Sequence, residues 1–115
     1  MTLVDADHRI GLAELRQMAT RTFGDLVKAV VDVDREAMAV DADLHADQEA
    51  FLLDEGSYQE HLWGINLHPD WPEGDWIEFD SVINIRPGQD NPSRDVLDEA
   101  VRRRIVAVVG GLVVR

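Results

Sequence analysis

The sequence predicts a single α+β domain over residues 1–115, with a four-stranded antiparallel or mixed sheet and helices packed on one face. Three observations lead to this prediction. Apolar residues recur at helical spacing near both ends of the chain, apolar and polar residues alternate in the segments between, and the length is typical of one domain. The element order is α-β-β-α-β-β-α, and two hairpins separated by helices favour helices gathered on one side of the sheet.

The first predicted helix runs from Gly11 to Phe23. Its apolar residues recur every three or four positions, and Gly24 follows as a residue that commonly ends a helix. The next two elements are strands at 26–34 and 36–44. The first of these alternates apolar with charged residues and the second is rich in small apolar residues, so together they predict a hairpin.

A second helix is predicted at 46–55, because acidic residues occupy its first turn and Gly56 follows its end. A second hairpin follows, with strands at 62–68 and 76–86 joined by a turn-rich loop. The strand at 76–86 has the clearest alternation. It places Ile77, Phe79, Ile83 and Ile85 on one face and Glu78, Asp80, Asn84 and Arg86 on the other.

The last predicted element is a helix capped by Asp95. From Leu97 to Leu112 its apolar residues recur every three or four positions. An irregular loop at 87–93 precedes it.

The chain is strongly acidic, with a net charge of −12 and no cysteine. Such a charge argues against nucleic acid or an anionic membrane as a partner, because those surfaces are bound by clustered Lys and Arg. The absence of cysteine excludes disulfides and thiolate metal sites. Asp5 and Asp7 are unlike a secretory signal, and no stretch approaches the ~20 apolar residues of a membrane span. We therefore expect a cytoplasmic protein.

The strand alternation collects polar side chains on the sheet face opposite the predicted core, where they form a candidate ligand site. Its members are Lys28, Asp32, Asn66, Glu78, Asp80, Asn84 and Arg86. Two carboxylates two residues apart on a strand, as in Glu78 and Asp80, can divide acid and base roles. The alternative is ion pairing, in which Arg86 satisfies several carboxylates of neighbouring strands.

A second candidate site is a divalent metal bound by His45, Asp47 and Glu49, which lie within five residues. The alternative is structural: the two acids complement the dipole of the second helix, and His45 forms a hydrogen bond in the preceding loop.

Trp71 lies in the loop of the second hairpin between Pro69 and Pro72, and indoles are frequent interface anchors. We therefore expect Trp71 to contact a partner. The acidic stretch at 32–60 is a further contact surface for a basic partner, or simply a solvated face.

Several runs of the sequence resemble a small prokaryotic family of unknown function, DUF5674. The runs are FGDLVKAVVDV at 23–33, LHAD at 44–47, LWGIN at 62–66, WIEFDS at 76–81 and INIRP at 83–87. The resemblance covers nearly the whole chain, and it implies no activity.

Two functional interpretations follow. The first is a binding or interaction protein that self-associates and uses the polar sheet face and the Trp-bearing hairpin. The second is a small metal-assisted, hydrolase-like enzyme that uses His45, Asp47 and Glu49 with Glu78 or Asp80. No phosphate loop, dinucleotide fingerprint or serine nucleophile motif is present, so no cofactor is expected.

Overall fold

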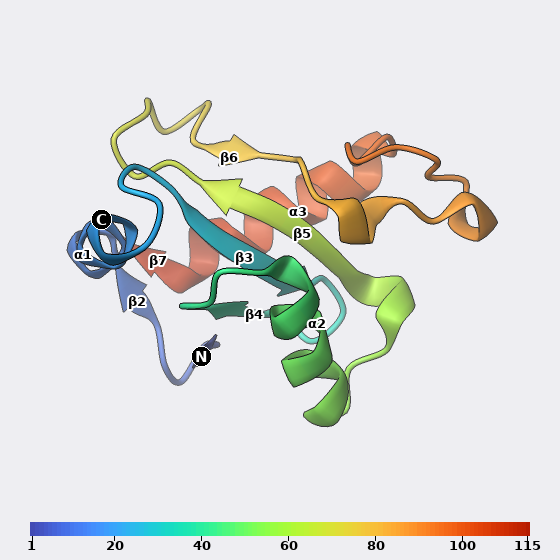
Figure 1. The fold of residues 1–115 in the computed structure, drawn as a ribbon, viewed down its shortest axis with the longest axis horizontal. Coiled ribbons are helices and arrows are strands. Elements are labelled where there is room, and N and C mark those ends of the chain that lie inside the picture. Colours follow the sequence, from blue (N-terminus) through green and yellow to red (C-terminus); the bar gives the residue numbers. More distant parts are fainter.

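A five-stranded antiparallel sheet forms the centre of the computed structural model, which describes residues 1–115 (Figure 1). The strand order is β1-β4-β3-β5-β6, and the bounds are β1 Thr2–Val4, β3 Val27–Asp32, β4 Ala37–Val40, β5 Leu62–Leu67 and β6 Ile77–Glu78. The α+β class and the antiparallel sheet are confirmed. The sheet has one strand more than predicted, because the N-terminal β1 is too short for its alternation to be recognised.

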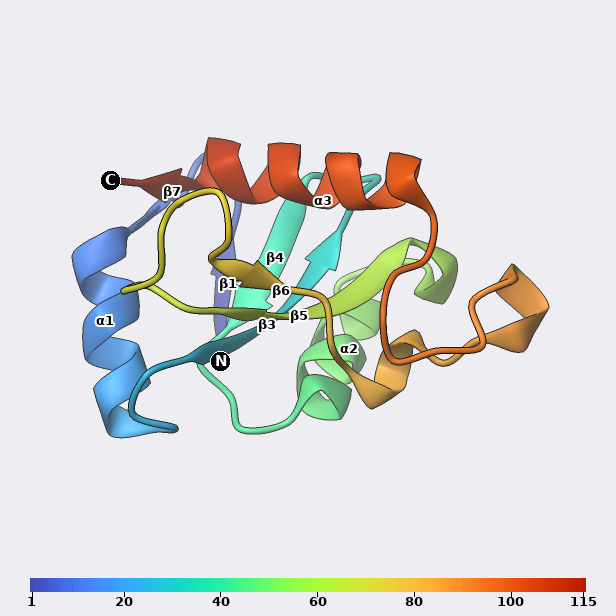
Figure 2. The same ribbon diagram turned by 90° about the horizontal axis from the view of Figure 1, so that it is seen from above.

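Helices cover both faces of this sheet, contrary to the prediction that they share one (Figure 2). Helix α3 (Glu99–Leu112) crosses one face, and α1 (Leu12–Arg21) packs into the same core. Helix α2 (His45–Asp54) lies on the opposite face, which is partly covered rather than open.

The two faces have cores of different size. The larger core contains the alternating residues of β3 and β5, such as Val31 and Ile65, together with the buried sides of α1 and α3. The smaller core contains Val30, which breaks the alternation of β3. There Val30 packs with Leu62 beneath Leu52 of α2. An apolar patch on the second face therefore binds α2.

The long strand predicted at 76–86 is wrong. Only β6 pairs, and the chain then turns into a short 3-10 helix, η2 (Val82–Asn84). The hydroxyl oxygen of Ser81 accepts a hydrogen bond from the Ile83 amide and caps this turn. As a result Ile83 packs on the smaller core and Ile85 is 45% exposed, so the predicted apolar face does not exist beyond Phe79.

Short elements complete the fold. Two further 3-10 helices are η1 (Gln59–His61) and η3 (Pro87–Gln89), and β2 (Ile10–Gly11) pairs in parallel with β7 (Val113–Val114) beside the C-terminus. No helix combines the length and the apolar character that crossing a membrane requires.

Helix α3 begins later than predicted, with Asp98 and not Asp95 as its cap. The carboxylate of Asp98 accepts hydrogen bonds from the amides of Ala100 at 2.8 Å and Val101 at 3.4 Å. Asp95 instead accepts from the Val96 amide within the preceding loop.

Candidate functional site

Three of the predicted polar residues form a row across the sheet. Lys28 of β3 is paired with Asn66 of β5, which is paired with Glu78 of β6. Directly paired residues of antiparallel strands send their side chains to the same face. The row lies beyond the end of β4, which pairs with β3 only at 30–32.

Asn66 connects this row to the loop that follows β6. Its Nδ2 donates to Glu78 Oε1 at 2.9 Å and to the Asp80 carbonyl oxygen at 3.3 Å. His68 Nε2 lies 3.2 Å from the same Glu78 oxygen, and the His68 ring stacks on Trp71 with centroids 3.6 Å apart. Buried Asn66 Oδ1 has no hydrogen-bond partner. The Glu78 carboxylate is thus held between an amide and an imidazole, and no bond to Asp80 divides acid and base roles between them.

Lys28 is the only lysine of the chain and has no carboxylate partner. Its Nζ lies 5.0 Å from the centre of the Phe23 ring, which is a cation–π distance. In a protein with about twice as many acidic as basic residues, a half-buried ammonium without an ion pair is free to receive an anionic ligand.

His45, the first residue of α2, points into the same region and is only 8% exposed. Its Nε2 lies 2.7 Å from the carbonyl oxygen of Ile65 in β5. A carbonyl oxygen only accepts hydrogen bonds, so Nε2 carries the hydrogen and Nδ1 carries a lone pair in the neutral ring. Nδ1 has no partner in the protein and is not among the enclosed polar atoms, so this lone pair is open to solvent.

Burial holds the pKa of His45 below its ordinary value. The hydrogen bond to Ile65 acts in the opposite direction, and the positive charges of Lys28 and Arg94 lower the pKa further. Asp80 raises it without forming an ion pair with the ring. The ring is therefore neutral near pH 7 and able to accept a proton or a hydrogen bond.

This pKa shift predicts a loss of stability on mild acidification. The unfolded chain takes up a proton on His45 below about pH 6.5, whereas the folded chain resists protonation. The free energy of unfolding should therefore fall as the pH is lowered from about 7 to about 5. Urea unfolding at both pH values measures this loss of stability. The loss should be smaller in His45→Gln, whose amide still donates to Ile65, than in the parent. The control His8→Gln, at an exposed site, should lose as much as the parent. Equal losses in the parent and His45→Gln would contradict the assignment.

His45 lines a pocket of about 190 Å³ between the start of α2 and η2. We call this the His45 pocket; its charged lining residues are Lys28 and Arg94, and it contains no Asp or Glu. Arg94 Nε lies 2.6 Å from Asp80 Oδ1, so the guanidinium is oriented by that carboxylate. The pocket combines two cations with one hydrogen-bond acceptor.

The predicted metal site at His45, Asp47 and Glu49 is not formed. No three His, Asp or Glu side chains lie close enough together to hold a metal ion. His45 is turned toward the sheet by its bond to Ile65, whereas Asp47 is exposed. Of the three, only His45 reaches the pocket.

Asp32 belongs to a turn and not to the polar site. It lies four residues along β3 from Lys28, about 13 Å away. Its carboxylate accepts hydrogen bonds from the amides of Asp34 and Arg35, both at 2.9 Å, and from the Ser57 hydroxyl at 2.6 Å. Asp32 thus fixes the connection between β3 and β4.

Asn84 forms hydrogen bonds with backbone groups at the edge of β5, beyond the end of β6. Its Oδ1 accepts from the Gly64 amide at 2.8 Å, and its Nδ2 donates to the Gly64 carbonyl oxygen at 2.9 Å and to that of Arg94 at 3.0 Å. The side-chain amide thereby replaces the peptide group of a neighbouring strand.

Arg86 continues this edge by a different contact from the one predicted. It donates to the carbonyl oxygens of Leu62, at 2.5 Å, and Gln59, and its guanidinium carbon lies 4.1 Å from the centre of the Trp63 ring. It forms no ion pair, so the prediction that it satisfies several carboxylates is wrong. The Leu62 carbonyl at this edge of β5 has no partner in β6, and Arg86 supplies its donor.

Two contributors to the pocket were not singled out as site residues from the sequence. Arg94 lies outside the predicted strands, so no alternation placed it on the polar face. Its arrangement depends on Asp80, fourteen residues earlier, and on its carbonyl contact with Asn84. Ser81 was assigned to the apolar face of the long strand, although it lines the His45 pocket. The one usable signal for Arg94 was its position among acids in a loop otherwise free of cations.

Comparison with known proteins adds a family but no activity. A family model of proteins of unknown function, DUF5674, matches residues 4–112. Neither the curated proteins nor the solved structures contain a match. The matched range covers all three helices and almost the whole sheet, and the chain therefore belongs to the DUF5674 family.

Proposed function

We propose that this protein binds a small organic anion, a hydroxy acid, in the His45 pocket. The observation that carries the proposal is the arrangement around the His45 ring. A neutral, buried imidazole opens its lone pair to a pocket whose charged lining is exclusively cationic, in a chain with a net charge of −12.

The ligand class follows from the hydrogen-bonding groups in the pocket. Lys28 and Arg94 are donors that favour a carboxylate. His45 Nδ1 is an acceptor and requires a donor from the ligand, which a hydroxyl group supplies. A carboxylate with a neighbouring hydroxyl satisfies both requirements.

The apolar residues of the pocket determine the chemical character of the rest of the ligand. Leu44 and Val82 line it and are each more than half exposed. A short branched hydrocarbon chain covers such residues and gains about 25 cal/mol per Å² of apolar surface removed from water. The volume of about 190 Å³ limits the ligand to a small molecule.

A second candidate is hydrolysis with His45 as general base, favoured by the lowered pKa and the open Nδ1. Nδ1 takes a proton from water while the water oxygen adds to an ester carbonyl carbon. The alkoxide then leaves and receives that proton. Cleavage of a hydroxy-acid ester that is lost in His45→Gln distinguishes this reaction from binding alone.

The binding proposal predicts saturable association of 2-hydroxy-3-methylbutanoate in isothermal titration calorimetry. The matched acid 3-methylbutanoate, which lacks the hydroxyl, should bind about tenfold more weakly because it leaves His45 Nδ1 without a donor. Lys28→Gln should weaken the hydroxy acid by about tenfold or more, because a hydrogen bond to a charged group contributes about 1.5 to 3 kcal/mol. Arg103→Gln removes an exposed positive charge outside the pocket and serves as the control.

Two results would overturn the proposal. The first is the absence of saturable binding of either acid up to about 20 mM, a concentration well above a Kd of 1 mM. The second is equal weakening by Lys28→Gln and Arg103→Gln, which would show that overall charge and not the pocket binds the acid.

We also propose that the protein self-associates and that it is cytoplasmic. Trp71 is 44% exposed and held by its stack on His68, and an exposed ring in a fixed orientation is suited to contact a second copy. The absence of cysteine supports a reducing compartment such as the cytoplasm.

A further inference from the structure

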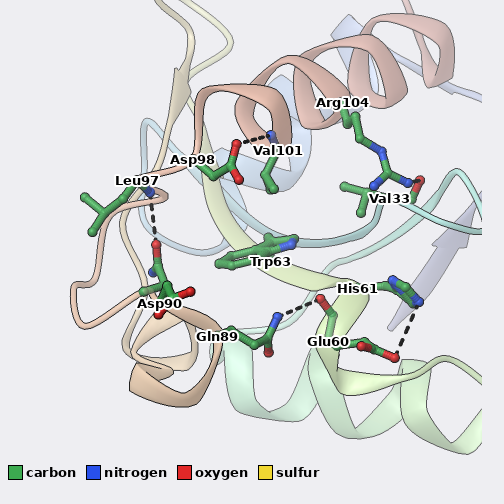
Figure 3. A pocket seen from close by; sticks show the side chains of 11 residues that line it. Val33, Glu60, His61, Trp63, Gln89, Asp90, Leu97, Asp98, Val101 and Arg104 are labelled. Carbon is green, nitrogen blue, oxygen red and sulfur yellow. Dashed lines mark hydrogen bonds and ion pairs between the residues drawn. The ribbon is translucent and has the colours of Figure 1, made fainter.

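A larger cleft of about 520 Å³ lies on the other side of the sheet, at the start of α3 (Figure 3). Helix α3, η1 and the loop after η3 form its walls, and β5 contributes Trp63 at its base. It shares no lining residue with the His45 pocket. Its volume falls within the range of small-molecule sites.

Trp63 presents an unused hydrogen-bond donor to this cleft. The residue is 5% exposed, and Arg86 covers its ring. Its Nε1 is bonded to no group of the protein, yet it is not among the enclosed polar atoms, so the N–H opens into the cleft. Because no protein group accepts from it, this N–H is available to an acceptor on a ligand.

The wall toward which the indole nitrogen points carries Arg104, His61 and Glu60 (Figure 3). Glu60 Oε1 lies 3.8 Å from His61 Nε2, so these two groups face each other and Arg104 is the group left for a ligand. Arg104 Nη2 donates to the Val33 carbonyl oxygen at 3.0 Å, which fixes the guanidinium at the cleft. Arg104 forms no ion pair. Its remaining N–H groups and the indole N–H therefore suit a carboxylate.

The opposite wall carries two carboxylates, Asp90 and Asp98 (Figure 3). Asp90 adopts a left-handed backbone conformation with φ 59°, and its side chain has no hydrogen bond or ion pair. Asp98 uses Oδ1 to cap α3, which leaves Oδ2 for another donor. This wall suits an ammonium group.

We propose that the cleft binds a short peptide with free termini, its carboxylate at Trp63 and Arg104 and its ammonium group at Asp90 and Asp98. With Glu60 facing His61, the groups left for a ligand are Arg104 and the indole N–H on one side and Asp90 and Asp98 on the other, and this is the reason for a zwitterion. A simple anion would leave the two carboxylates without a donor, and a simple cation would leave the indole N–H without an acceptor. The site is independent of the hydroxy-acid pocket.

Calorimetric titration with the dipeptide Ala-Ala and its two blocked forms tests both ends of the proposed ligand. Ala-Ala should bind saturably, and N-acetyl-Ala-Ala and Ala-Ala amide should each bind at least about tenfold more weakly, because each lacks one of the two charges. These comparisons use the parent protein and do not depend on any variant folding.

Variants then locate the site. Trp63→Phe keeps an aromatic ring and removes the N–H, and Arg104→Gln removes the guanidinium; each should weaken Ala-Ala about fivefold or more. Arg103→Gln, one position earlier on α3, lies outside the cleft and should bind as the parent does. Thermal unfolding of each variant confirms that it is folded before it is titrated.

The proposal is overturned if Ala-Ala does not bind, if either blocked form binds as tightly as Ala-Ala, or if folded Arg104→Gln binds like Arg103→Gln. Loss of binding in Lys28→Gln would place the peptide in the His45 pocket and would also overturn it.

Discussion

Replacing Asn84 with aspartate is expected to lower the free energy of unfolding by about 3 to 5 kcal/mol near pH 7. Asn84 is completely buried, and its amide exchanges hydrogen bonds with both polar groups of Gly64. Aspartate has the same shape and still accepts from the Gly64 amide. Its second oxygen, however, faces the carbonyl oxygens of Gly64 and Arg94, to which Asn84 donates.

The pH dependence of this variant provides an internal check. A buried carboxylate beside two carbonyl oxygens has a raised pKa in the folded state, so the folded variant binds its proton more readily than the unfolded chain. The deficit should therefore be complete above the folded pKa and shrink as the pH falls toward about 4. Urea unfolding of Asn84→Asp at two pH values measures both effects.

Gln89→Glu is the matched control, because it changes an exposed amide with a single backbone contact. It should cost less than about 1 kcal/mol. A loss below about 1 kcal/mol for Asn84→Asp would show that the edge of β5 does not depend on the side-chain amide.

The spacing of apolar residues, alternating in the strands and recurring every three or four positions in the helices, was sufficient to predict β3, β4, β5 and all three helices to within a few residues. It failed at 76–86, where apolar and polar residues alternate although only two residues pair with a neighbouring strand. There the Ser81 cap and the Asn84 amide end the strand. Both are contacts between a side chain and a backbone group, and such contacts leave no periodic pattern.

The alternation of apolar and polar residues also predicted part of the candidate site. The alternation placed Lys28, Asn66 and Glu78 on one face, and the structure aligns them. Val30 lies on that face under Leu52 of α2, and this covering was not predicted because the helices were expected on the other face only. The orientation of His45 depends on a carbonyl group twenty residues away in β5, so it follows only from the docking of α2.

Replacing Gly64 with alanine is expected to cost about 2 to 4 kcal/mol of unfolding free energy. A Cβ at this position would lie 2.5 Å from Ser81 Cβ and 2.6 Å from Ser81 Oγ, closer than non-bonded atoms approach. Space rather than backbone conformation requires glycine here, because the φ of Gly64 is not positive. The substitution should also displace the 81–83 segment, which forms one wall of the His45 pocket.

Removal of the clashing side chain separates this mechanism from a general effect of the substitution. In a Ser81→Gly background neither clashing Ser81 atom is present, so Gly64→Ala should cost much less than in the parent. Gly110→Ala on α3 is the matched control: a Cβ there would meet no neighbouring atom within 4 Å, and alanine should stabilise the helix by about 0.5 to 1 kcal/mol. Chemical denaturation of the four combinations at positions 64 and 81 measures the coupling. If Gly64→Ala costs the same in both backgrounds, the contact with Ser81 is not the reason for glycine.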